Sequence, residues 1–241
     1  MAVDTIFVNA RIVDGTGAPW YRGSVGVRDG EIAFTKQVRE PDVEADERVD
    51  VDDDVLCPGF VDTHSHSDLR VFEEPTLAPK VRQGITTEVL GQDGFSMAPL
   101  HRDGAAEAWA EQLSGLAGAT DREWTWGSVS EYLDAVADDG VAPNVATLVG
   151  QGTVRFEVMG MTDRDPTEDE VAEMRRLVRN ALEDGALGLS TALVLTPCSY
   201  ADTDELRELV AELRPYGRPF VAHIRSERGG IWEALDEFVD L

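Results

Sequence analysis

The sequence predicts an α/β fold in which parallel strands alternate with helices, preceded by a small β-rich segment. Strand-like runs separated by turns fill the first 57 residues, whereas short apolar runs alternate with helical patterns from Val55 onward. With 241 residues, of which 42% are hydrophobic, the chain can bury a sizeable core.

Residues 1–57 carry the β-rich pattern. The Asp29-Gly30 pair lies between two strand-like runs and is typical of a tight β-hairpin. Strands are expected at residues 5–10, 11–14, 24–28 and 31–34.

Strands alternate with helices in the second part of the chain. Thr167 and Glu170 form a capping-box pattern, and the apolar positions that follow predict an amphipathic helix. The apolar stripe over residues 203–213 predicts another helix, and residues 105–126 are expected to form an irregular helical insertion. The strands of this part are expected near residues 55–62, 86–90, 144–149, 187–190 and 220–223.

Two histidines follow the first of these strands. His64 and His66 are one residue apart, and because alternate residues of a strand point the same way, their imidazoles can share one cation. At the carboxyl end of a barrel strand such a pair lies on the catalytic rim. The pattern predicts a metal-dependent hydrolase, and a pair of structural histidines is the alternative.

Five ordered blocks carry a family resemblance. They are PGFVDTHSHSD at 58–68, GITTEVLGQDGFSMAP at 84–99, VGQGTVR at 149–155, GALGLST at 185–191 and AHIRSE at 222–227. Together they resemble the amidohydrolase superfamily, and within it the D-aminoacylase, or N-acyl-D-amino-acid deacylase, branch. The resemblance covers essentially the whole chain.

The resemblance implies a fold and a reaction. Residues 58–241 are expected to form the N-terminal half of a (β/α)8 TIM barrel, with about five strands, and residues 1–57 part of a small β-sandwich. The implied reaction is hydrolysis of the amide bond of a small-molecule N-acyl-D-amino acid. In the family the general-base aspartate follows strand eight, which is expected beyond Leu241. The chain alone is therefore expected to be inactive and to need a complementing C-terminal chain.

The resemblance also implies a metal site. His64, His66, Asp93 and His223 are expected to hold one or two divalent ions, with zinc expected and manganese or iron open, because Asp93 stands where the branch has a cysteine and its oxygen is harder than sulfur. An ordinary Asp-Gly turn is the alternative for Asp93. In many amidohydrolases a carboxylated lysine after strand four bridges two metal ions. Such a lysine is excluded here, because Lys80 is the last lysine of the chain and precedes that strand.

Four further residues match the family's motifs. Asp68, Arg225 and Glu227 are expected to orient ligands or contact the substrate, and Arg155 could bind a substrate carboxylate bidentately. A surface ion pair is the alternative for Arg225 and Glu227.

Two other functions stay open at this point. One is a non-catalytic metal-binding half-barrel or truncated gene product, which the missing base favours. The other is an amidohydrolase that acts on another amide or on a cyclic imide. The set of His64, His66 and His223 favours an enzymatic origin.

The composition is strongly acidic, with 47 acidic against 21 basic residues and a formal net charge of −26. Nucleic acid is therefore not expected as a partner. The N-terminus lacks a targeting pattern, and no apolar run approaches the roughly 20 residues that span a bilayer, so a cytoplasmic location without membrane contact is expected. An acidic proteome in a halophilic host that accumulates salt is our hypothesis for the charge.

We expect the free energy of unfolding to rise with salt, because the screening length falls from about 10 Å at 0.1 M to about 3 Å at 1 M and weakens the repulsion between carboxylates. Unfolding curves recorded from low to multimolar KCl measure this effect. A chain that is equally stable at both extremes would contradict the hypothesis.

Overall fold

The computed structural model describes residues 2–118, 120 and 122–241. The chain divides after Gly59 into two compact units. The first unit contains the strands β1 (Val3–Ile12), β2 (Tyr21–Arg28), β3 (Glu31–Lys36), β4 (Ala45–Asp50) and β5 (Val55–Leu56). The strands of the second unit are β6 (Phe60–Asp62), β7 (Ile85–Leu90), β8 (Asn144–Thr147), β9 (Val149–Gly150), β10 (Leu189–Ala192) and β11 (Phe220–His223). Its helices are α1 (Arg70–Glu73), α2 (Ala78–Val81), α3 (Ala105–Leu113), α4 (Val129–Asp139), α5 (Gln151–Met159), α6 (Glu168–Glu183), α7 (Thr203–Ala211) and α8 (Ile231–Asp240), with short 3-10 turns at Cys198–Tyr200 and Arg214–Tyr216.

The first unit is one sheet with the strand order β3-β2-β1-β4, in which β5 also pairs with β1. The predicted hairpin is confirmed: β2 and β3 are antiparallel, and Asp29 and Gly30 between them have φ angles of 54° and 78°. Both angles are positive, as a two-residue type I′ turn requires.

The two strands predicted at residues 5–10 and 11–14 are a single strand, β1. Its pairing register with β2 shifts between Phe7 and Ala10, where Asn9 has a φ of 57°. This irregularity is a β-bulge, which adds one unpaired residue and bends the strand without ending it.

The strand predicted over residues 55–62 is wrong as a single element. Residues 55–56 form β5 and pair with β1, whereas residues 60–62 form β6 and pair with β7. Pro58 and Gly59 lie between them, and proline has no amide hydrogen to donate to a sheet ladder. The two ends of this apolar run therefore pair in two separate sheets.

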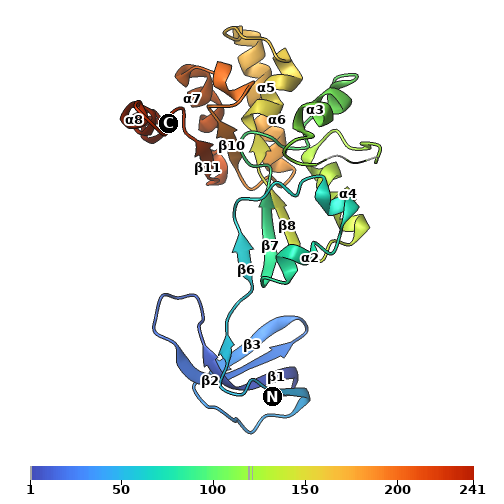
Figure 1. Ribbon diagram of the computed structural model, residues 1–241, viewed down its shortest axis with the longest axis vertical. Coiled ribbons are helices and arrows are strands. Elements are labelled where there is room, and N and C mark those ends of the chain that lie inside the picture. The colour runs from blue at the N-terminus through green and yellow to red at the C-terminus, as the bar shows by residue number, and fades with distance from the viewer. Residues whose placement is uncertain (1, 119, 121) are drawn as a thin grey trace. The chain divides into compact units, whose positions relative to one another are not determined.

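The second unit is an arc of parallel strands. β6, β7 and β8 form one sheet and β9, β10 and β11 the next (Figure 1). Leu148, between β8 and β9, donates from its amide to Leu90 O at 2.9 Å, and the Val149 amide donates to Gly188 O at 2.9 Å. The segment from Asn144 to Gly150 thus connects both sheets, and the five strand positions follow one another in sequence order. The predicted alternation of strands and helices is confirmed.

The helix predicted after Thr167 is confirmed as α6. The Thr167 hydroxyl accepts from the Glu170 amide at 3.3 Å, and the Glu170 carboxylate accepts from the Thr167 amide at 2.8 Å. The helix predicted at 203–213 is shorter, because α7 ends at Ala211. Part of the insertion predicted over residues 105–126 is α3, and residues 119 and 121 of it lie outside the described residues.

None of the described helices has both the length and the apolar character needed to cross a bilayer.

Candidate metal centre

The loops after β6 and β7 bring two imidazoles to one carboxylate. The Nε2 atoms of His64 and His66 lie 3.4 Å and 3.1 Å from the same Oδ2 atom of Asp93. One donor atom from each of the three residues lies within 4.8 Å of the others. These are three of the four ligands that the sequence predicted.

The spacing fits a bound ion. Two ligand atoms that are each about 2.1 Å from a tetrahedral zinc ion lie about 3.4 Å apart, which is close to both observed distances. Two imidazoles and a carboxylate also form a donor set that zinc, iron and manganese accept. The residues present therefore fit a divalent transition metal.

The surroundings of Asp93 favour its charged form. A hydrogen bond from His66 is the main cause that holds the pKa of the carboxyl below its ordinary value, and the charges of His64, His66 and His223 act in the same direction against the effect of burial. A charged carboxylate is the form that binds a metal ion.

His223 lies at the end of β11 and faces the same space. Together with His64, Asp93 and Glu227 it lines a cavity of about 210 Å³. Among the described residues, the cluster of donor atoms within 4.8 Å of one another does not include His223. Its Nε2 lies 3.4 Å from Oε1 of Glu227 instead. Its role as a ligand stays a prediction.

Ser65 anchors the loop that carries the two histidines. Its hydroxyl donates to Oε2 of Glu88 at 2.7 Å and accepts from Nζ of Lys80 at 3.1 Å. Glu88 is fully buried on β7, and Lys80 also forms an ion pair with Asp62. The sequence reasoning missed this network, although a glutamate within the apolar run of a strand is a signal that could have indicated it.

Asp68 anchors the loop that carries Asp93. Its Oδ1 accepts from the Gly91 amide at 2.8 Å, and the Gln92 side chain donates to Thr63 O at 2.7 Å. Asp68 is 1% exposed, and burial raises the pKa of its carboxyl to about 6. Its contact is therefore with the backbone of the Asp93 loop.

Arg155 was predicted to contact a substrate carboxylate, but in the structure it has a different partner. The side chain is fully buried on α5 and pairs with Glu205 of α7. Gln151 donates to the same carboxylate at 3.0 Å and accepts from Thr191 at 2.9 Å. A guanidinium enclosed in this network already has its carboxylate partner, so it stabilises the contact between helices.

Arg225 and Glu227 contact different partners and do not pair with each other in the described structure. Arg225 pairs with Glu237 of α8 at 2.9 Å and donates to Ala201 O at 3.0 Å. Glu227 contacts His223 directly. Glu227 is thus beside a predicted ligand, whereas Arg225 connects α8 to the start of α7.

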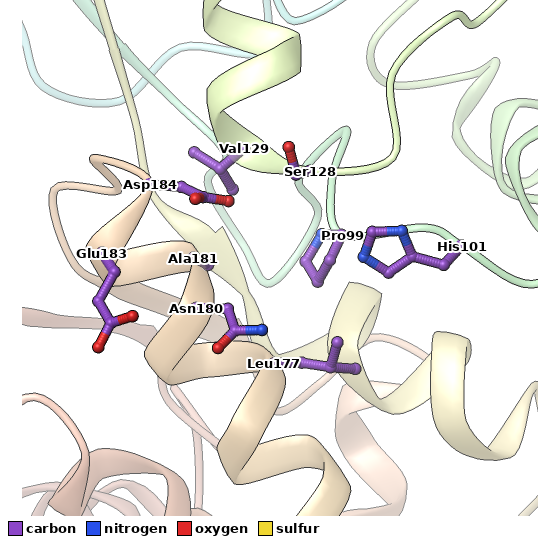
Figure 2. Close-up of a pocket in the computed structure, with 9 residues that line it drawn as sticks. All are labelled: Pro99, His101, Ser128, Val129, Leu177, Asn180, Ala181, Glu183 and Asp184. Carbon is purple, nitrogen blue, oxygen red and sulfur yellow. The ribbon is translucent and has the colours of Figure 1, made fainter.

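His101 lies in a different pocket, of about 280 Å³. Figure 2 shows it beside Pro99, across from Glu183, the last residue of α6, and Asp184, which follows the helix. It is absent from the described cluster of metal donors, which makes it a suitable control histidine.

Comparisons with known proteins identify the family of the chain. The Amidohydrolase family matches residues 47–238. The chain is 34% identical over 235 residues to D-aminoacylase and 37% identical over 236 residues to N-acyl-D-aspartate deacylase, both from Alcaligenes xylosoxydans xylosoxydans. These matches cover 97% of this chain and 47% and 46% of the two relatives, so the chain spans about half the length of the curated relatives it matches.

A solved structure covers the whole chain. It is N-acyl-D-glutamate deacylase from Bordetella bronchiseptica in complex with zinc and a phosphonate inhibitor that mimics the tetrahedral intermediate. The TM-score is 0.87 at 33% identity, with 100% of this chain and 49% of that chain covered. This match confirms the predicted fold class, and the family model confirms that the chain belongs to the amidohydrolases.

We expect Asp93→Asn and Asp93→Ala both to lower the Zn²⁺ affinity of the chain, on the order of 100-fold or more, because each removes a charged ligand. Asparagine tolerates the positive φ of 57° at this position, so Asp93→Asn keeps the turn and removes the charge. Titration against a chromophoric chelator measures the affinity.

His101→Ala is the matched control and is expected to bind Zn²⁺ like the unsubstituted chain. If Asp93→Asn also kept full affinity, Asp93 would be a turn residue and not a ligand.

Proposed function

Because the chain belongs to the amidohydrolase family, we propose that it supplies the metal-binding half of an enzyme that hydrolyses the amide bond of N-acyl-D-amino acids. The ligands we propose are His64, His66 and Asp93, with His223 as a further ligand across the cavity. The activity is proposed for the complete protein, since this chain spans about half the length of its curated relatives.

One observation carries the proposal. Two imidazole nitrogens from the loop after β6 meet one carboxylate oxygen from the loop after β7, at 3.4 Å and 3.1 Å. The three side chains come from segments 27 residues apart, and each loop is held by its own buried hydrogen bonds. An arrangement anchored in this way is what a preformed metal site requires.

We propose zinc as the ion. The zinc complex of the Bordetella deacylase supports this choice, as do the two nitrogen donors of the chain. The hard oxygen of Asp93 lowers the selectivity against manganese and iron, which a thiolate would exclude more strongly.

The side chains have separate tasks in this proposal. A divalent ion here would act as a Lewis acid toward the amide carbonyl and make hydroxide available at neutral pH. His66 and Asp93, with side chains 21% and 15% exposed, are the enclosed part of the site, whereas His64 is 56% exposed. The substrate amide would therefore approach from the side of His64, where Val221 and Ala222 of β11 also line the cavity.

The proton transfers need a general base. We propose that it comes from a complementing C-terminal part of the barrel, in the same or another chain. Glu227, which lines the cavity, would then act on His223 and not on the substrate.

We expect the complete protein that contains this sequence to release free D-amino acid from N-acetyl-D-glutamate, N-acetyl-D-aspartate or N-acetyl-D-leucine and to leave the L-enantiomers intact. His66→Ala should lower kcat/KM by at least about 100-fold, because it removes a ligand of the Lewis acid. Chiral chromatography of the products measures both effects, and His101→Ala is the control.

Equal cleavage of both enantiomers would exclude a D-specific deacylase. Full activity of His66→Ala would exclude the proposed metal site.

A further inference from the structure

Among the residues that the structure describes, Ser190 has a side chain that hydrogen-bonds to both ends of the turn carrying Asp93. It lies on β10 and is fully buried. Its hydroxyl accepts from the Gly94 amide at 3.0 Å and donates to the carbonyl oxygen of Gly91. One hydroxyl therefore closes the four-residue turn from Gly91 to Gly94.

The turn needs such a support. Gly91, Asp93 and Gly94 have φ angles of 70°, 57° and 80°. Glycine adopts these values freely, but a residue with a side chain is disfavoured there and keeps the conformation only when its surroundings impose it. In this conformation of the turn the carboxylate of Asp93 points at the two histidines.

The turn also fits closely against its neighbours. A Cβ atom at Gly94 would lie 2.5 Å from the Cys198 sulfur, and one at Gly91 would lie 2.1 Å from Leu148 O. This close packing leaves the backbone little freedom as long as the hydrogen bonds to Ser190 are present. Without them, a buried amide and a buried carbonyl would lose their partner and the turn would shift to satisfy them.

We propose that Ser190 is a positioning residue that holds the Asp93 carboxylate at the metal site, an inference that rests on the proposed function. Its two hydrogen bonds are to the turn that carries Asp93, whereas the two histidines have their own anchor in Ser65, Glu88 and Lys80.

A double-mutant cycle tests this coupling. Zn²⁺ affinity is measured for the unsubstituted chain, Ser190→Ala, Asp93→Ala and the double variant. We expect Ser190→Ala to weaken Zn²⁺ binding about 10- to 100-fold when Asp93 is present. In the Asp93→Ala chain, where the two histidines keep a weaker site, Ser190→Ala should cause no further loss.

Ser96→Ala is the matched control. Ser96 is also buried, and its hydroxyl also accepts from one backbone amide, that of Gly150 at 2.9 Å, and donates to one carbonyl, that of Ala98. The substitution thus removes the same two kinds of hydrogen bond but neither of the two that close the turn. We expect Ser96→Ala to keep the Zn²⁺ affinity within about twofold of the unsubstituted value. A larger loss would mean that removing any buried serine hydroxyl weakens Zn²⁺ binding.

Hydrogen exchange of the unsubstituted chain provides a second test that needs no variant. The Gly94 amide should be protected like the amides of β10, because Ser190 accepts its hydrogen. Exchange at the rate of an exposed loop would overturn the inference.

The inference is also overturned if Ser190→Ala binds Zn²⁺ as tightly as the unsubstituted chain, or if it weakens binding equally with and without Asp93. An unsubstituted chain that binds no Zn²⁺ would overturn the proposed function itself, and this inference with it.

Discussion

The parallel pairing of β6 with β7 is the constraint on which the candidate metal site depends. In this register Val61 lies opposite Thr87 and Asp62 opposite Glu88, so β6 ends two residues before the end of β7 at the same edge of the sheet. His64 follows Asp62 after one residue, and Asp93 follows the end of β7 after two. Because parallel strands release their loops at the same edge, imidazoles and carboxylate meet there without further rearrangement. A shift of the register would separate them.

Buried polar groups fix the details that strand pairing leaves free. Glu88 and Lys80 hold Ser65, Asp68 holds Gly91, and Ser190 closes the Asp93 turn. A buried carboxylate without a partner is costly, so each such group restricts its neighbours to the few arrangements that satisfy it. A few of the many carboxylates therefore organise the site, while most of them face solvent.

The sequence predicts the donor residues better than their supports. The sequence singles out His64 and His66 by their spacing at the end of a strand and Asp93 by the family motif after the next strand, although both histidines lie in the loop after β6 and not in the strand itself. The contacts of Ser190 span 96 and 99 residues, and the partner of Arg155 is 50 residues away, so their roles depend on a register that no local pattern encodes. The strand expected over residues 55–62 failed for a related reason, because a continuous apolar run does not reveal that its two ends belong to different sheets.

The most direct test is an anomalous difference map at the zinc absorption edge from crystals of the Zn²⁺-loaded chain. We expect a peak about 2.0–2.2 Å from Nε2 of His64, Nε2 of His66 and a carboxylate oxygen of Asp93. A zinc ion that is bound without Asp93, or that lies outside the loops after β6 and β7, would contradict it.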